Sequence, residues 1–419
     1  MLLVSYNLTV GQTKTEIQDV IANSVHSIAN INELKLTEIS RLIPGIDSVK
    51  VLGLGEGTHG TKEFINFRAD VSKILIKEKG YKIIFIESSF GDTYEFNRQL
   101  NNNVQNLDSL MKERLFAIYQ TEEYKSFFQW LQKHNAGLNE GEKVKIVGID
   151  FALVSSTSRL LKDDLSFNKV FSNLCDTIVK QASFQDSIWI NMNRKEFKFD
   201  MKAVVINGIY MVANVHSVKK LAADNNIKLS SLANLCIMNI EHAGEPFYAP
   251  QKKRPARSRD ELMAQVVEEE LKENNLHSLI WAHNGHVAYK AVKGSAGGMG
   301  KFIKKQHPSY FSLATGTALG NYNATLDRFN NNQNKFKPYP LNKPIKGSWE
   351  EVFMGLENNY NYLDLTGIKN KNFLEDLRFR VIGYGLQSSG DGDYVDSAIG
   401  DLFDGLVFIK STASADSLK

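Results

Sequence analysis

Short apolar runs with polar residues at their ends recur along this 419-residue chain, and they constrain its fold more than any other feature. The runs are nearly continuous rather than alternating, which is the pattern of strands buried on both faces of a parallel sheet. Stretches with helical spacing separate them, such as the one containing Phe64, Phe67 and Val71. The sequence therefore predicts an α/β fold with a mostly parallel central sheet flanked by helices. The predicted strands are residues 49–56, 82–89, 143–150, 276–284, 310–316, 379–385 and 406–411.

One long stretch interrupts the alternation of strands and helices. Residues 155–245 contain no comparable strand run, and residues 202–221 carry their strongest helical pattern. We expect residues 155–245 to form a helical insertion that makes part of a ligand-binding cleft. Residues 46–154 and 246–419 would then form the α/β catalytic core, and residues 1–45 a helical lead-in.

Composition and charge argue against several classes of protein. Hydrophobic residues make up 42% of the chain and charged residues 23%, which is ordinary for a globular protein. Fifty basic and 47 acidic residues give a net charge of +3, too small to indicate a nucleic-acid or membrane partner. No window approaches about 18 consecutive apolar residues, and the N-terminus lacks the pattern of a signal peptide. We expect a soluble, cytoplasmic protein, and the sequence leaves its oligomeric state open.

The sequence offers no evident nucleophile. Cys175 and Cys236 are the two cysteines, and without a C-x-x-C motif they support neither a disulfide framework nor a thiolate zinc site. No G-x-S-x-G motif is present to expose a serine on a sharp strand-to-helix turn. Ser88 and Ser89 lie near a predicted strand end, but they lack flanking glycines and fit a helix cap better.

Titratable residues stand at the ends of four successive predicted strands. The first strand ends at Glu56, the second at Glu87 and the third at Asp150. The fourth ends at His283, with His286 just beyond it. A single Glu or His after a strand is more often a loop residue or a helix cap. Because ligands of open α/β sheets bind beyond the carboxyl ends of the strands, the whole set points to a functional site.

The segment GEGTHG, residues 55–60, follows the first predicted strand. Its glycines allow the backbone to turn sharply and to approach a ligand. His59 precedes a predicted helix, and the positive end of the helix dipole disfavours an imidazolium ion there. A neutral histidine can accept a proton at pH 7, as a general base must. His59 is therefore the candidate base, with Glu87 or Glu56 positioning the water or the imidazole.

Two arginines and one further carboxylate complete the candidate set. Arg68 falls near the buried face of the helix after His59, so its guanidinium needs a carboxylate partner. Glu56, Glu63 and Glu87 are candidates for that partner, and a purely structural ion pair beneath the site is the alternative reading. The candidate substrate-binding residues are Glu63, Asp150 and Arg259.

A set of short motifs resembles one known family. In chain order they are GEGTHGTKEF (55–64) with Arg68, FIESS (85–89), SRDELMA (258–264), WAHNGHV (281–287), MG (299–300) and FDGLVFI (403–409). Together they resemble the erythromycin esterase family. The resemblance implies a hydrolase that needs no metal or other cofactor and opens a macrolide lactone, with the histidine of the GE-x-THG motif activating water. It also implies His59 as the base, with Glu56, Arg68, Glu87, His283 and His286 lining the site.

We therefore predict a hydrolase that cleaves a carboxylic ester or a macrocyclic lactone, such as a macrolide antibiotic, by attack of water activated by His59. Arg68, His283 and His286 would stabilise the oxyanion. A metal-dependent hydrolase could use the same Glu and His side chains as ligands, since both suit a divalent ion. A third possibility is a non-catalytic protein that only binds its ligand in the same cleft. The predicted partner is a small-molecule ester or lactone, with antibiotic resistance as the associated role.

Overall fold

The computed structural model describes residues 23–31, 33–102, 104–272, 276–291, 297–325, 329, 336–366, 377–396 and 398–418. Most of the expected helical lead-in lies outside these residues. Its described part contains the strand β1 (Val25–Ser27) and the helix α2 (Leu36–Leu42). The expectation of helix over residues 25–27 is wrong, because these residues pair antiparallel with residues 361–363 at the edge of the sheet.

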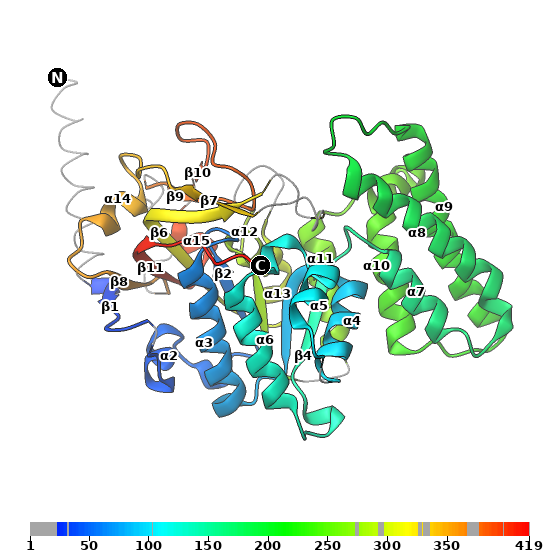
Figure 1. Cartoon of the computed structure of the whole chain (residues 1–419), viewed down its shortest axis with the longest axis horizontal. Helices are drawn as coiled ribbons and strands as arrows, with labels where there is room; N and C mark the ends of the chain where they lie inside the picture. Colours follow the sequence, from blue (N-terminus) through cyan, green and yellow to red (C-terminus); the bar gives the residue numbers. More distant parts are fainter. Residues whose placement is uncertain are drawn as a thin grey trace.

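A nine-stranded sheet forms the centre of the described residues, with helices on both faces (Figure 1). Besides β1 it contains β2 (Val51–Glu56), β3 (Ile83–Ser89), β4 (Lys145–Asp150), β5 (Ser278–His283), β6 (Phe311–Ala324), β7 (Lys337–Pro340), β8 (Tyr360–Asp364) and β11 (Gly405–Thr412). The strand order is β1-β8-β11-β6-β2-β5-β3-β4, and β7 pairs with β6. From β11 to β4 in this order the strands are parallel, which confirms the predicted α/β fold. The strands β1, β7 and β8, which the sequence did not predict, pair antiparallel.

Alternate residues of the central strands enter two hydrophobic cores on opposite faces of the sheet. Leu52 and Leu54 of β2 belong to one core, whereas Val51 belongs to the other. Because both faces are covered, the strands are apolar at nearly every position, as the sequence showed. The first core is covered by α3 (Lys62–Lys79) and α6 (Glu122–Asn135), and the second by α11 (Arg259–Lys272) and α13 (Met299–Gln306).

Between β4 and α11 the chain forms a group of long helices, which Figure 1 shows beside the β4 edge of the sheet. The group contacts the core through α4 (Phe90–Leu100) and α11. Its predicted contribution to a ligand-binding cleft stays a prediction. No helix within the described part of the chain is long and apolar enough to cross a membrane. The helices of the group are α7 (Ser155–Asp164), α8 (Ser172–Asn191), α9 (Met201–Asp224) and α10 (Ser231–Tyr248).

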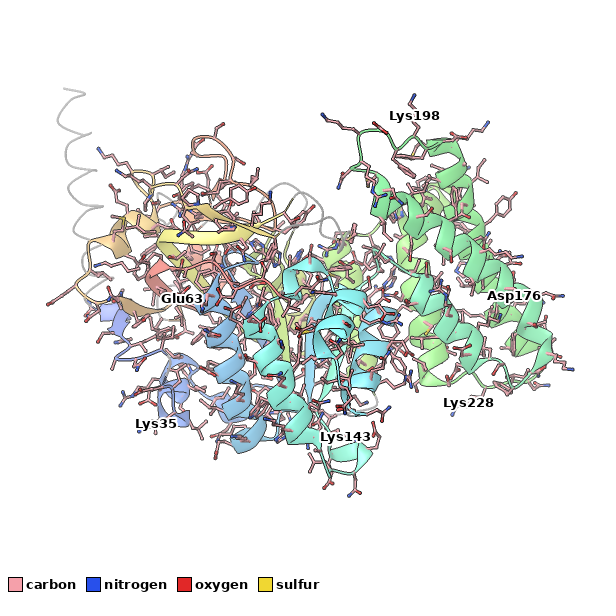
Figure 2. The ribbon with its side chains drawn as sticks, in the orientation of Figure 1. Lys35, Glu63, Lys143, Asp176, Lys198 and Lys228 are labelled. Atoms are coloured by element: carbon pink, nitrogen blue, oxygen red, sulfur yellow. The ribbon has the colours of Figure 1, made fainter. Side chains whose placement is uncertain are left out.

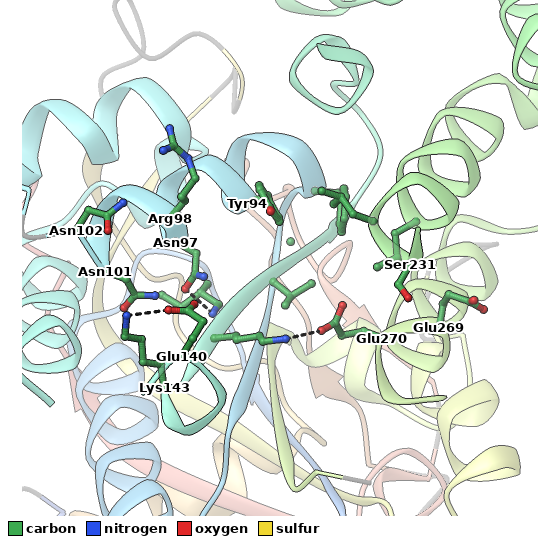
Figure 3. Close-up of a pocket in the computed structure, with 17 residues that line it drawn as sticks. Tyr94, Asn97, Arg98, Asn101, Asn102, Glu140, Lys143, Ser231, Glu269 and Glu270 are labelled. Atoms are coloured by element: carbon green, nitrogen blue, oxygen red, sulfur yellow. Dashed lines mark hydrogen bonds and ion pairs between the residues drawn. The ribbon is translucent and has the colours of Figure 1, made fainter. Parts of the chain in front are cut away.

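A groove of about 570 Å³ runs along the exposed edge of β4, between α4 and α10 (Figure 3). Its charged side chains include the ion pairs Lys143–Glu140, at 2.8 Å, and Lys145–Glu270, at 3.5 Å. Asn97 of α4 accepts a hydrogen bond from the N–H of Ile146, so its side chain satisfies one backbone N–H group at the edge of β4. Paired charges and capped backbone groups at an edge oppose pairing with another chain.

One predicted strand is largely absent. Within residues 379–385 the only strand is β9 (Phe379–Arg380), and it pairs with β10 (Tyr394–Val395) rather than with the central sheet. The residues that follow make other hydrogen bonds: Val381 N–H donates to the Asp393 carbonyl at 2.7 Å, and Ile382 N–H to the Gly57 carbonyl at 3.3 Å. The apolar run therefore supports the loop after β2 instead of adding a strand.

Candidate active site

The carboxyl ends of β2, β5, β3 and β4 lie side by side at one edge of the sheet, because these strands are parallel neighbours. The titratable side chains at these ends are buried, with exposed fractions from 0% for Asp150 to 9% for His286. The Arg259 side chain, at 29%, is the most exposed member of the group. The predicted residues that the structure brings together are Glu56, His59, Arg68, Glu87, Asp150, Arg259, His283 and His286.

His59 is held by a single carboxylate. Its Nδ1 lies 2.8 Å from Oε1 of Glu56, and a carboxylate can only accept, so the ring proton sits on Nδ1. The other oxygen of Glu56 accepts from Nη2 of Arg68 at 2.6 Å. A neutral His59 in this arrangement keeps a lone pair on Nε2. Nε2 lies 3.8 Å from Oε2 of Glu87, too far for a direct hydrogen bond.

Arg68 lies beneath the site rather than in it. Its side chain is fully buried, and its Nη2 also donates to the Tyr124 hydroxyl. The guanidinium lies 5.8 Å from the Tyr124 ring centre and 5.5 Å from that of Trp281. Burial works against its charge, but Glu56 raises the pKa of Arg68. The structure thus favours the ion-pair reading of Arg68 and contradicts its expected contact with an oxyanion.

Glu87 is the central residue of a second group of charged side chains. Nη2 of Arg259 donates to Oε1 of Glu87 at 3.0 Å and to Oδ2 of Asp150 at 2.6 Å. Burial by itself would raise the pKa of Glu87, but His286, Arg259 and His59 together lower it well below its usual value. Burial likewise opposes the charge of Arg259, and Asp150 and Glu87 raise its pKa. Glu87 is therefore a carboxylate and Arg259 a cation at neutral pH.

His286 lies between two carboxylates. Its Nδ1 is 2.7 Å from Oδ1 of Asp260, and its Nε2 is 3.2 Å from Oε1 of Glu87. Burial disfavours the charged ring, yet Glu87 and Asp260 raise the pKa of His286 to about 9. Nε2 also lies 3.1 Å from Nη1 of Arg259. A protonated Nε2 has no lone pair to accept that N–H, so the imidazolium ion donates to Glu87 instead.

His283 is neutral and engaged on both ring nitrogens. Nε2 donates to the Ile382 carbonyl at 2.8 Å, and Nδ1 accepts from the N–H of Gly285 at 3.3 Å. Burial, together with the nearby His59 and His286, lowers the pKa of His283 to about 3. No N–H of this ring remains for an oxyanion, so the structure contradicts the role expected for it. His283 instead forms part of the wall beside His59, with ring centres 5.2 Å apart.

Glu63 does not join the site. It lies in the first turn of α3, and its carboxylate accepts a hydrogen bond from the N–H of Ala413 at 2.9 Å. Figure 2 shows Glu63 on the core, at the end of α3 where the helix begins. The first turn of α3 directs this side chain toward the segment after β11 rather than toward the other predicted residues. The expected contact between Glu63 and the substrate has no support in this placement.

Several residues that hold the site were missed in the sequence. Asp260 directly follows Arg259 and accepts from His286 and from the N–H groups of Gly297 and Met299. Its position beside Arg259 was a usable signal. Tyr119 had none: it lies far from any predicted strand end, yet its hydroxyl accepts from the N–H of Glu87 at 2.9 Å. The other missed residues are Tyr124, Asn284 and Thr315.

The polar side chains of the site are bonded mainly to one another. Glu56 binds His59 and Arg68, while Glu87 binds Arg259 and His286. Within the residues that the structure describes, no three His, Cys, Asp or Glu side chains are grouped so that they could hold a metal ion. What the arrangement offers chemically is a histidine lone pair beside a carboxylate, next to a histidine cation and an arginine.

Comparison with known proteins gives one family. The sequence model of the erythromycin esterase family matches residues 76–412. Erythromycin esterase type II of Escherichia coli is 30% identical over 105 residues, which are 25% of this chain and 24% of that protein. The match thus spans about a quarter of this curated relative.

Solved structures show the same fold over nearly the whole chain. A succinoglycan biosynthesis protein superposes with a TM-score of 0.74 at 18% identity, covering 96% of this chain and 98% of that one. A mutant of the erythromycin esterase EreC in its open conformation gives a TM-score of 0.69 at 16% identity, covering 94% of this chain and 99% of that one. At these identities the superpositions establish the fold alone.

Proposed function

This chain belongs to the erythromycin esterase family, and on that premise we propose that it is an esterase that cleaves a carboxylic ester or lactone by direct attack of water. The observation that carries the proposal is the pair formed by His59 and Glu87. The free Nε2 of His59 and Oε2 of Glu87 are 3.8 Å apart. A water oxygen that contacts both atoms would be held next to a base whose other nitrogen is fixed by Glu56.

The proposed reaction has two steps. Nε2 of His59 takes a proton from the water while the water oxygen attacks the acyl carbon, and the carbonyl electrons move onto the carbonyl oxygen. When the tetrahedral intermediate collapses, the bond to the alcohol oxygen breaks and that oxygen takes the proton from His59. The products are a carboxylic acid and an alcohol, which remain in one molecule if the substrate is a lactone.

Two cations are available to stabilise the oxyanion. Within the described residues the Nε–H of Arg259 has no hydrogen-bond partner. The atom is buried although the side chain as a whole is 29% exposed, so Arg259 would have to turn to donate this N–H to an oxyanion. The imidazolium of His286 lies next to Arg259. Its two N–H groups are directed at Asp260 and Glu87, so it would act on the oxyanion through its charge rather than as a hydrogen-bond donor. One well-placed donor lowers the barrier by about 3 to 4 kcal/mol in an acyl-transfer site. His286 thus keeps the role that the sequence suggested for it, and we assign Arg259 the role suggested for Arg68 and His283.

A serine nucleophile has little support. Ser88 and Ser89 are fully buried at the end of β3, where an ester could not reach them. Direct attack predicts no burst of alcohol release at high enzyme concentration and no acyl adduct in the intact mass after rapid quenching. A burst with an adduct on either serine would replace water attack by a covalent route.

The experiment is a hydrolysis screen on the purified protein. Aryl esters of increasing acyl length and macrocyclic lactones, including macrolides, are incubated with the wild-type protein and with His59→Asn as the blank. Hydrolysis by the wild type that is lost in His59→Asn supports the proposal. Equal hydrolysis by both proteins contradicts it. Saturable binding of a lactone without turnover in either protein would identify a ligand-binding protein instead.

A further inference from the structure

The segment Ala413–Leu418, here named the strap, follows β11 and lies beside the loop that carries His59. Lys62 N–H donates to the Ala413 carbonyl at 2.9 Å, and Ala415 N–H donates to the Gly60 carbonyl at 3.0 Å. Gly60 directly follows His59 in the sequence. The backbone of the strap is thus bonded on both sides of Thr61, between His59 and the start of α3.

The other half of the strap is bonded to the turn that opens α6. Glu122 N–H donates to the Asp416 carbonyl at 2.8 Å, and Leu418 N–H donates to the Gln120 carbonyl at 3.1 Å. The N–H of Asp416 in turn lies 3.1 and 3.2 Å from the two carboxylate oxygens of Glu123. One short segment therefore links the loop after β2 to the beginning of α6.

Both linked segments support the candidate active site. The turn before α6 carries Tyr119, whose hydroxyl accepts from the N–H of Glu87, and α6 carries Tyr124, which binds Arg68. The loop carries His59 itself. The strap thus ties the support of Glu87 to the loop of His59.

Glu123 binds both the strap and the start of α3. Its side chain is only 5% exposed, so its charge needs partners. It has them in the Asp416 N–H and in Nζ of Lys62, which lies 3.6 Å from Glu123 and 2.6 Å from the Asp416 side chain. Lys62 is the first residue of α3. The buried carboxylate therefore joins α6, the strap and the start of α3 directly after the His59 loop.

We propose that Glu123, acting through the strap, is a positioning residue that holds His59 at its distance from Glu87. The proposal rests on His59 being the base of the reaction proposed above. Losing the Glu123 carboxylate would leave the Asp416 N–H without its acceptor and Lys62 with only its Asp416 partner among the described residues. The strap would then loosen and let the His59 loop move. A base that shifts by about 1 Å can lose about 100-fold in rate, although the residue that moved it never touches the substrate.

The test compares Glu123→Ala with Glu123→Gln and with Glu122→Ala. Glutamine keeps an oxygen that can accept from the Asp416 N–H, and Glu122 is the adjacent residue with a half-exposed carboxylate near Lys125. We expect Glu123→Ala to lower kcat by at least about 10-fold with KM nearly unchanged. Glu123→Gln should recover most of that loss, and Glu122→Ala should match the wild type. Equal kcat for all four proteins would overturn the proposal.

A second readout needs no substrate. The ring of His59, which faces Glu56, Glu87 and His283, is followed by NMR in histidine-labelled protein at one fixed pH. A displaced ring loses its bond to Glu56, so the Nδ1–H signal of His59 should shift in Glu123→Ala and not in Glu122→Ala. An unchanged signal contradicts the positioning role, whereas a shifted signal without any hydrolysis would contradict only the proposed reaction. If Glu123→Ala does not fold, Lys62→Met removes the partly exposed cation that joins Glu123 to the start of α3. It should lower kcat in the same direction by a smaller factor, and a kcat equal to that of the wild type would contradict the proposal.

Discussion

The two histidines His59 and His286 have the same kind of partner at Nδ1 but differ in their distance from Glu87 at Nε2. Each places Nδ1 against one carboxylate, at 2.8 Å for Glu56 and 2.7 Å for Asp260. The Nε2 of His286 is also within 3.2 Å of Glu87, but the Nε2 of His59 stays 3.8 Å from it. In addition, Arg68 offsets the charge of Glu56, whereas the partners of Asp260 besides His286 are, among the described residues, backbone N–H groups.

The difference assigns the two rings opposite tasks. Two carboxylates within reach stabilise an imidazolium, and the pKa of His286 rises to about 9. One carboxylate that is already paired with an arginine orients the ring of His59 and leaves its outer nitrogen free to accept a proton. In the proposed reaction, the distance to Glu87 and the pairing of Glu56 with Arg68 thus separate the proton acceptor from the cation.

Replacing His59 should have the largest effect on activity of the changes considered for the two histidines. We expect His59→Asn to lower kcat/KM by at least about 100-fold, the lower end for the loss of a general base. The melting temperature should change little, because Asn can still donate to Glu56. The measurement is hydrolysis of the best substrate from the screen, with thermal unfolding as the control. A variant with half the wild-type activity would remove His59 from the mechanism.

Removing the charge under His59 should affect stability as well as activity. Arg68→Met leaves Glu56 buried without its cation, and breaking a buried ion pair costs about 3 to 5 kcal/mol. Denaturant unfolding measures this loss. The variant Lys73→Met is the control, since Lys73 lies on the same helix in a partly exposed pair with Asp70. A loss no larger than in the control would show that Arg68 does not stabilise Glu56.

Weakening the ion pairs of the His286 cation should shift the alkaline side of the profile of activity against pH. The folded pKa of His286, about 9, is above its ordinary value of 6.5, so its contribution to stability is complete below about pH 6.5 and is lost as the pH rises through 9. If the cation stabilises the oxyanion, activity should fall over the same upper range. Asp260→Asn removes one partner and should move this fall to lower pH. An unmoved alkaline limb would exclude His286 as the group that titrates there.

Metal removal should have the smallest effect. The carboxylates and imidazoles of the site are bound to arginines, to backbone groups and to one another, which leaves few lone pairs directed at a common point. We expect protein purified without added metal to contain no stoichiometric zinc or manganese and to keep its activity after chelation. Activity lost on chelation and restored by one ion would show that the site depends on a metal. The roles proposed for His59 as base and His286 as cation would then be wrong.

The sequence by itself determined the fold class and the edge of the sheet at which the titratable side chains gather. Runs apolar at nearly every position require strands covered on both faces, and parallel neighbours bring their carboxyl ends to one edge. Glu56, Glu87, Asp150 and His283 could therefore be placed together from their positions at strand ends alone.

Only the tertiary structure decided which groups pair and which carry charge. Glu56 rather than Glu63 binds Arg68, and His286 rather than His283 is the cation, because hydrogen bonds depend on distances of a few tenths of an ångström and on burial. Such distances are set by segments far apart in the chain. Asp416 reaches Glu123 across 293 residues, and no local pattern in either segment records that contact.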